Sequence, residues 1–167
     1  MNIQNNYFDD FVSVFESLKK HRVEYILIGG VAVILYGLER FTGDLDIFIR
    51  PTRDNIRKLR ESLFSVFEDS AVEEITFQEL SEYAVIRYGT PNGFYIDIMT
   101  RIGEAAVYDD LEYEVAEYMG TSINIATPET LLRLKQDTVR HKDKADAIFL
   151  RELIQYRKSA QYDRKEK

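Results

Sequence analysis

Two aspartates inside one short apolar stretch constrain the fold more than any other feature of the sequence. Asp44 and Asp46 alternate with Leu45, Ile47 and Ile49, and this period of two residues is typical of a β-strand. Aspartate is rare in strand interiors, so a pair of them needs an explanation. Residues two apart on a strand project from the same face, which places both carboxylates side by side. An exposed sheet face gives the same alternation, so the motif alone does not separate a functional site from solvated surface.

The segments around this strand predict an α/β protein with a mixed, twisted sheet, flanking helices and a helical C-terminal part. Val23–Ile28 is almost continuously apolar, as in a strand that is buried on both faces. Gly89–Gly93 has strong turn chemistry between two apolar segments, which predicts a hairpin. Thr52 can cap one helix, and Thr127 followed by Pro128 opens another. We expect strands over residues 23–28, 44–49, 83–88, 94–99, 113–119 and 122–126, and helices over residues 8–18, 31–36, 52–67 and from 127 onward.

The length of 167 residues and the 45% hydrophobic content allow one sizeable core and leave little room for a second. We therefore expect a single domain over residues 1–167, with an α/β core over about 1–126, helices over about 127–158 and a frayed tail over 159–167. The absence of cysteine excludes disulfides, thiolate metal sites and cysteine nucleophiles. The two histidines, His21 and His141, lie far apart in sequence and give no support to a histidine metal cage or catalytic triad.

The charge balance and the hydropathy pattern limit the kinds of partner that we expect, in particular nucleic acid and membranes. A net charge of -7 is unfavourable for a protein that coats nucleic acid through its overall field, although a local basic patch remains compatible with it. The longest apolar run, near Ile26–Tyr36, is too short and too interrupted by glycine to span a membrane, and no cleavable signal is visible. We expect a cytoplasmic protein without a membrane partner.

Two further features give the paired aspartates a chemical context. Gly29 and Gly30 follow a buried strand and precede a helix, where they let the backbone approach an anion such as a triphosphate, although any tight turn favours glycine. Asp97 is a single acid in an apolar strand. If that strand neighbours the one that carries Asp46, the three carboxylates can share divalent cations about 3.5 to 4 Å apart, and Asp97 can act as a base toward an acceptor hydroxyl.

These elements together resemble the nucleotidyltransferase signature of the polymerase-beta superfamily. The matching residues are Gly29-Gly30, Arg40, Thr42, Asp44-Leu45-Asp46 and Tyr95-Ile96-Asp97-Ile98, and the family often has Gly-Ser where this chain has the two glycines. The resemblance implies the nucleotidyltransferase fold and the transfer of NMP from an NTP with Mg²⁺ or Mn²⁺. It also implies that Asp44, Asp46 and Asp97 hold the metals, and that Gly29, Gly30, Arg40 and Thr42 bind the nucleotide.

The C-terminal part carries a second resemblance. After Thr127-Pro128-Glu129, the residues Lys135, Arg140, Lys142, Asp143 and Asp146 are similar to the helical motifs of abortive-infection (AbiEii-like) nucleotidyltransferase toxins. If one helix continues here, Lys135, Val139, Lys142 and Asp146 share a face, so Lys135 could meet a triphosphate while an acid orients it. We therefore assign Lys135, Asp143 and Asp146 to nucleotide binding. A solvated helix with internal ion pairs would explain the same residues.

The acceptor of the transferred group has more than one interpretation. The toxin resemblance implies an RNA 3′ end or a protein hydroxyl, and a toxin–antitoxin role with a cognate antitoxin as partner. A basic cluster favours a phosphate-bearing acceptor; it comprises Arg133, Lys135, Arg140, Lys142 and Lys144. The same layout resembles small lincosamide nucleotidyltransferases, which act on a small molecule. A catalytically silent relative that keeps the fold as a binding module is the remaining alternative.

Overall fold

The computed structural model describes residues 4–103, 106–135 and 141–166. Its centre is a mixed sheet of six strands in the order β3-β4-β2-β1-β8-β7. The strands are β1 (Tyr25–Ile28), β2 (Asp44–Ile49), β3 (Val85–Gly89), β4 (Tyr95–Met99), β7 (Tyr113–Tyr118) and β8 (Thr121–Ala126). Two short strands, β5 (Arg101–Ile102) and β6 (Ala106–Val107), form a separate ribbon.

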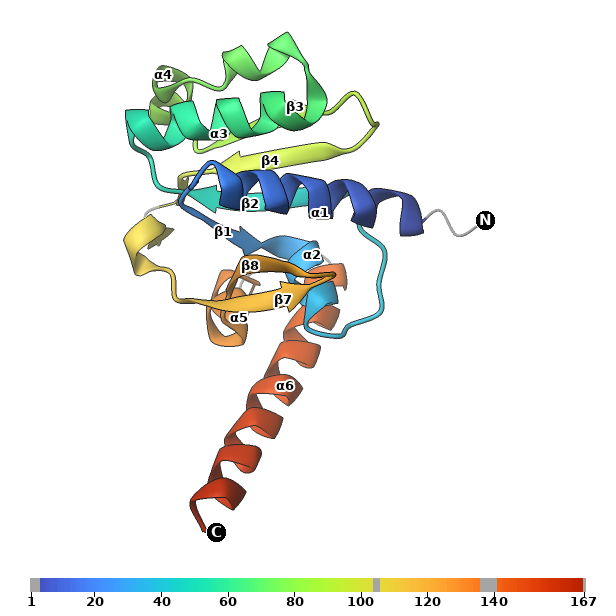
Figure 1. Ribbon diagram of the computed structural model, residues 1–167. Helices are drawn as coiled ribbons and strands as arrows, with labels where there is room; N and C mark the ends of the chain where they lie inside the picture. Colours follow the sequence, from blue (N-terminus) through green and yellow to red (C-terminus); the bar gives the residue numbers. More distant parts are fainter. Residues whose placement is uncertain (1–3, 104–105, 136–140, 167) are drawn as a thin grey trace.

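Helices cover the two faces of this sheet unequally (Figure 1). On one face lie α1 (Gln4–Lys20) and α3 (Arg53–Phe67), which pack against each other. On the other lie α2 (Gly29–Leu35), α5 (Pro128–Lys135) and α6 (His141–Lys165). The short helix α4 (Phe77–Glu82) and the 3-10 turns η1 (Ser70–Glu74) and η2 (Tyr108–Asp110) belong to the connections.

The alternation of apolar and acidic residues in β2 determines which face of the strand is buried. Leu45, Ile47 and Ile49 are fully buried, on the face of the strand opposite to Asp44 and Asp46. Burial of an aliphatic side chain of this size contributes about 1.5–3 kcal/mol, so these three residues fix the orientation of the strand. The register follows: a slip of one residue would bury the aspartates and expose the apolar set.

Strand pairing brings β2 and β4 together although about fifty residues of sequence separate them. The two strands are parallel neighbours, and Asp46 lies opposite Asp97 in the register. On its other side β2 pairs antiparallel with β1, so that Ile28 lies opposite Asp46. The predicted hairpin is confirmed, because β3 pairs antiparallel with β4 around the turn that precedes Phe94. The predicted pair of strands over 113–126 is confirmed as well.

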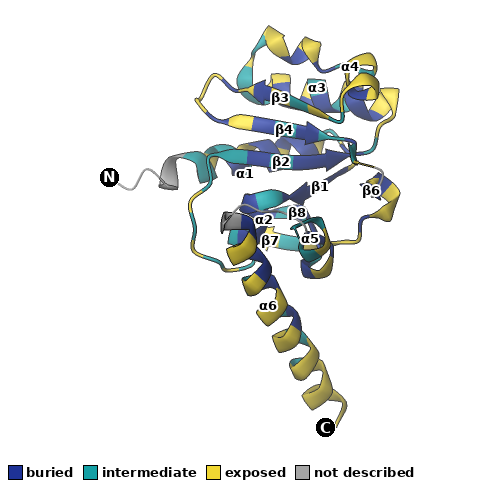
Figure 2. Ribbon diagram, turned by 180° about the vertical axis from the view of Figure 1, so that it is seen from behind, coloured by how far each residue is buried: buried dark blue, intermediate teal, exposed yellow. Residues whose placement is uncertain are grey.

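The C-terminal part differs from the expectation in two respects. Lys135 ends α5 and Asp146 lies in α6, and these two helices pack against each other, so a single continuous helix is wrong. The positions Val139 and Arg140, on which part of the second resemblance depends, lie outside the described residues. In addition, α6 continues to Lys165, so most of the expected frayed tail is helical. Figure 2 shows that this end of α6 projects from the body and is exposed.

One polar cluster attaches the middle of α6 to the body of the protein. Arg157 makes two hydrogen bonds to the carboxylate of Glu114 in β7, at 3.1 and 3.0 Å. The hydroxyl of Tyr36 lies 2.9 Å from the same carboxylate and 2.8 Å from the carbonyl oxygen of Ala126. Hydrogen bonding to Arg157 lowers the pKa of Glu114, which keeps the pair charged. None of the helices in the described ranges is long and apolar enough to cross a membrane.

Candidate functional site

Three carboxylates meet on the sheet face that carries α2 and α5. Asp44 and Asp46 project from β2, and Asp97 projects from the adjacent position on β4. The side chain of Asp44 is 40% exposed and that of Asp97 is 14% exposed, so the cluster lies at the edge of solvent. Burial, together with the negative charges of Asp97 and Asp44, raises the pKa of Asp46 to about 6. The cluster therefore concentrates negative charge that only a nearby cation can offset.

The two glycines are required by the close approach of their neighbours. Gly29 has a φ of +74°, and a Cβ atom there would lie 2.1 Å from Oδ2 of Asp46. A Cβ atom on Gly30 would lie 2.5 Å from Nη2 of Arg40 and 3.1 Å from Oγ1 of Thr42. The glycine pair thus lets the backbone at the start of α2 lie directly against the acid, the guanidinium and the hydroxyl. The structure therefore brings Gly29, Gly30, Arg40, Thr42 and Asp46 together, and their role in nucleotide binding stays a prediction.

A buried ion cluster lies between the α2–β2 loop and the C-terminal helices. Asp146 is fully buried and contacts Nε of Arg40 at 3.1 Å and Nζ of Lys135 at 2.9 Å. The same Nζ donates a hydrogen bond to Asp143 at 3.1 Å. Among the described residues, neither carboxylate oxygen of Asp146 has a partner in hydrogen-bond geometry. Asp146 is therefore held by its charge contacts with Arg40 and Lys135, whereas Lys135 is also held by its hydrogen bond to Asp143.

Arg87 is the site residue that the sequence interpretation missed. It lies opposite Asp97 on β3 and donates to both carboxylate oxygens, from Nε at 2.9 Å and from Nη2 at 3.0 Å. The same Nη2 lies 3.4 Å from Oδ2 of Asp44. Hydrogen bonding to Asp97 raises the pKa of the Arg87 guanidinium further above its usual range, so the group stays charged. With the expected turn at Gly89–Gly93, a count of residues across the hairpin pairs Arg87 with Tyr95, whereas in the structure Gly89 lies opposite Tyr95 and Arg87 lies opposite Asp97.

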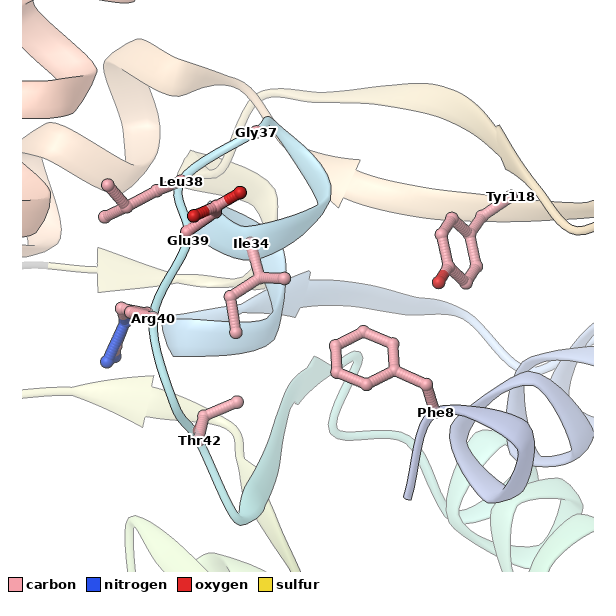
Figure 3. A pocket seen from close by; sticks show the side chains of 8 residues that line it. All are labelled: Phe8, Ile34, Gly37, Leu38, Glu39, Arg40, Thr42 and Tyr118. Atoms are coloured by element: carbon pink, nitrogen blue, oxygen red, sulfur yellow. The ribbon is translucent and has the colours of Figure 1, made fainter. Parts of the chain in front are cut away.

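Two cavities lie near these residues, and the smaller one is lined by two of the three acids, Asp46 and Asp97. A cavity of about 280 Å³ is lined by Gly29, Asp46, Asp97, Lys135 and Asp143, with apolar side chains such as Met99 and Leu134 forming the remaining wall. A larger cavity of about 590 Å³ lies beside the α2–β2 loop, and Figure 3 shows Phe8 and Tyr118 at one end and Arg40 and Thr42 along the loop. Because none of the three acids lines the larger cavity, we place the candidate site in the smaller one.

The donor set of this cavity fits a hard divalent cation. Carboxylate oxygens are the ligands that Mg²⁺ prefers, and Asp44, Asp46 and Asp97 present them from neighbouring strands. As the side chains stand, the described part of the chain contains no group of three acids or histidines that could hold a metal ion. Arg87 spans Asp44 and Asp97, so its guanidinium occupies carboxylate oxygens that a cation would need.

The described members of the predicted basic cluster have different surroundings. Lys135 is 10% exposed and its ammonium is committed to two carboxylates. Arg133 donates a hydrogen bond to the backbone carbonyl oxygen of Asp110, which is not one of the three site acids. Arg140 and the side chain of Lys142 lie outside the described residues. Of the expected cluster, Arg133 and Lys144 are exposed.

Comparison with protein-family models shows which family the chain belongs to. A family model described as "Nucleotidyl transferase of unknown function (DUF2204)" matches residues 7–166. The chain belongs to this nucleotidyl transferase family. A comparison with curated proteins gives no match.

Solved structures support the nucleotidyltransferase fold. The chain is similar to an antigenic nucleotidyltransferase-like protein from Paracoccidioides brasiliensis, with 20% identity, a TM-score of 0.58 and coverage of 90% of this chain and 78% of the other. It is also similar to a putative nucleotidyltransferase from Thermotoga maritima, with 16% identity, a TM-score of 0.51 and coverage of 92% and 96%. A third similar structure is the lincosamide antibiotic adenylyltransferase LnuA bound to lincomycin, with 16% identity, a TM-score of 0.50 and coverage of 90% and 96%. At these identities the likeness concerns the fold alone.

Proposed function

We propose that this nucleotidyltransferase moves an NMP group from an NTP to a hydroxyl acceptor in a metal-dependent reaction. The observation that carries the proposal is the meeting of Asp44, Asp46 and Asp97 on two adjacent parallel strands of the sheet. The cavity there also holds the backbone of Gly29 and the ammonium of Lys135. A nucleotide with its cations matches this combination of acids, close backbone and positive charge.

The three acids take different roles in this proposal. Asp44 and Asp46 would hold Mg²⁺ or Mn²⁺, which when bound screens the charge of the phosphate oxygens. Asp97 would complete this metal site and would also accept the proton of the acceptor hydroxyl. The hydroxyl oxygen forms a bond to the α-phosphorus, the bond from that phosphorus to the bridging oxygen breaks, and pyrophosphate leaves with the electron pair.

The residues around the acids bind and position the nucleotide. Gly29 and Gly30 give a phosphate direct access to the backbone, because neither carries a side chain that would block it. Arg40 and Lys135 supply positive charge, and Asp143 and Asp146 hold these cations in place from α6. Thr42 lies within reach of Gly30 and can donate its hydroxyl.

Two acceptor classes follow from different observations. An RNA 3′ end or a protein hydroxyl agrees with the similarity of the C-terminal motif to toxin nucleotidyltransferases, and would make the protein the toxin of a pair with an antitoxin. A small hydroxyl-bearing molecule is the second candidate, and the fold likeness to the lincomycin-bound adenylyltransferase favours it. Both classes use the same attack on the α-phosphorus.

Labelled nucleotides separate these acceptors in one experiment. The purified protein is incubated with each NTP, labelled at the α or the γ position, together with Mg²⁺ and either total RNA, cell protein or a panel of hydroxyl-bearing small molecules. NMP transfer moves the α label to the acceptor and leaves the γ label in pyrophosphate. Chelation of the metal by EDTA should stop the transfer. A protein that transfers no label and shows no metal-linked NTP binding would be a silent binding module.

An Asp46→Asn variant tests the role of the acids. We expect transfer to fall by about 100-fold or more, because the amide removes an anionic ligand while it preserves the size of the side chain. Asp109→Asn is the matched control, because Asp109 is 75% exposed and pairs with Arg50 away from the cavity. Far-ultraviolet circular dichroism should show both variants folded. Undiminished transfer by purified Asp46→Asn would contradict the assignment.

A further inference from the structure

Arg87 makes contacts that a divalent cation would otherwise make. Its guanidinium contacts both oxygens of Asp97 and one oxygen of Asp44, so a single positive group bridges carboxylates from two strands. These are two of the three acids that the proposed function assigns to the metal site. The remaining acid, Asp46, is the one whose pKa burial and neighbouring charge raise to about 6. Arg87 therefore offsets only part of the negative charge in the cluster.

The packing around Arg87 holds it beside the site without burying it. The guanidinium carbon lies 4.8 Å from the centre of the Tyr95 ring, which is a cation–π contact. The Tyr95 ring in turn lies across Gly89, where an added Cβ atom would be 3.3 Å from the ring. The side chain of Arg87 is 55% exposed, so no neighbouring helix prevents it from leaving the two carboxylates. Tyr95 can retain the guanidinium next to the cavity when it does so.

The contacts of Arg87 differ in strength. The fork on Asp97 is two-pronged and short, which is the favourable geometry between a guanidinium and a carboxylate. The contact with Asp44 is a single long one at 3.4 Å. A cation that approaches Asp44 and Asp46 would break the weaker contact first. A guanidinium that is freed in this way suits a phosphate group, whose oxygens accept the same two-pronged pairing.

We propose that Arg87 is a resident cation that competes with the divalent metal for Asp44 and Asp97 and transfers to a nucleotide phosphate when the metal binds. The inference rests on the proposed function, because it takes the same acids as metal ligands. Metal alone must displace Arg87 without compensation, whereas metal with nucleotide gives the guanidinium a new partner. Metal and nucleotide should therefore bind with positive coupling, each tightening the other.

Binding of Mn²⁺ measured by electron paramagnetic resonance tests this competition without any turnover. The wild-type protein, Arg87→Gln and Arg87→Lys are titrated with Mn²⁺ alone and again with α,β-methylene analogues of ATP, GTP, CTP and UTP, one at a time. We expect Arg87→Gln to bind Mn²⁺ alone about tenfold more tightly than wild type, because a competing charge is gone. The factor by which an analogue tightens Mn²⁺ binding should fall by about tenfold in the same variant.

Two further variants control for trivial effects. Arg57→Gln removes an arginine that pairs with Asp54 and Glu61 on the exposed side of α3, so it should leave Mn²⁺ affinity unchanged. Arg87→Lys keeps the charge but loses the fork, so its Mn²⁺ affinity should lie between those of wild type and Arg87→Gln. A structural defect at position 87 would weaken metal binding, which is opposite in sign to the effect of lost competition.

The outcomes separate this inference from the proposed function. Tighter Mn²⁺ binding and reduced coupling in Arg87→Gln support the inference. If wild type binds Mn²⁺ with an analogue but the two Arg87 variants show unchanged or weaker Mn²⁺ binding, the inference fails and the proposed function stands. If wild type binds no Mn²⁺ with any analogue, the proposed function is overturned and the inference falls with it.

Discussion

At the scale of single residues, Gly29 shows how one missing side chain shapes the site. Its φ of +74° lies in the left-handed region, and the space that a Cβ atom would need is occupied by the carboxylate of Asp46. Any other residue would strain the backbone and push the acid away from Asp97. The glycine therefore serves both the turn into α2 and the position of Asp46.

Substitution of Gly29 by alanine should destabilise the protein by about 2–4 kcal/mol, from the left-handed backbone and the clash together. Gly43→Ala is the matched control, because a Cβ atom there would meet nothing within 4 Å. Urea denaturation of both variants measures the difference in the free energy of unfolding. The control should stay within about 0.5 kcal/mol of wild type. Equal stability of the two alanine variants would contradict the steric argument.

At the scale of elements, the buried ions of α5 and α6 connect the C-terminal helices to the α2–β2 loop. Asp146 holds Arg40 from the loop and Lys135 from the end of α5, and it is completely buried. A buried charge that loses its partner retains the cost of leaving water. The contact therefore positions the helices over the cavity more than it adds net stability.

Replacement of Asp146 by asparagine should lower the free energy of unfolding by about 3 kcal/mol, because two buried cations lose their shared partner. Glu152 is an exposed residue of α6, so the control variant Glu152→Gln should change the free energy of unfolding by less than about 0.5 kcal/mol. Thermal unfolding at neutral pH measures both. If Asp146→Asn is as stable as Glu152→Gln, loss of the ion cluster does not lower the free energy of unfolding, and the prediction is contradicted.

The elements that the sequence predicts well have strong local signals. The bounds of β2 come directly from its alternation, and Thr52 caps α3 by accepting a hydrogen bond from the backbone of Asn55. Helix α4 was not predicted although Thr76 and Glu79 give a similar cap. In that segment the helix is only one and a half turns long, so its apolar period is too short to detect.

The parts that could not be predicted depend on packing between distant segments. Residues 136–140, which separate α5 from α6 in the sequence, contain neither glycine nor proline, so neither of the usual helix-stop residues marks the division. The meeting of Asp46 with Asp97 requires the parallel pairing of β2 and β4, which local patterns do not specify. The fork of Arg87 depends in addition on the register of the hairpin.

At the scale of the whole molecule, α6 divides into an attached part and a projecting part. Leu150 and Ile154 are buried, and Arg157 makes the last contact with β7 that the structure describes. Beyond it the helix is almost wholly exposed, as Figure 2 shows. An isolated helix of this length is marginal in water, because packing rather than propensity supplies most helical stability.

Hydrogen exchange followed by mass spectrometry should resolve these two parts. Backbone amides of residues 159–165 should exchange about 100-fold faster than those of residues 147–154, because local fraying exposes them without global unfolding. The measurement is repeated after dilution of the protein. Slow exchange at residues 159–165 that persists on dilution would show that the projecting part is stable by itself, whereas protection lost on dilution would indicate self-association.

The mixture of charges around the cavity has a consequence for the kinetics of substrate capture. Carboxylates outnumber cations there; the carboxylates are Asp44, Asp46, Asp97, Asp143 and Asp146, and the cations are Arg40, Arg87 and Lys135. With an overall charge of -7 as well, the protein repels a bare nucleotide at long range. Added salt screens this repulsion. Ionic strength therefore speeds the encounter with a free nucleotide, opposite in sign to its effect on proteins that hold polyanions on a basic surface.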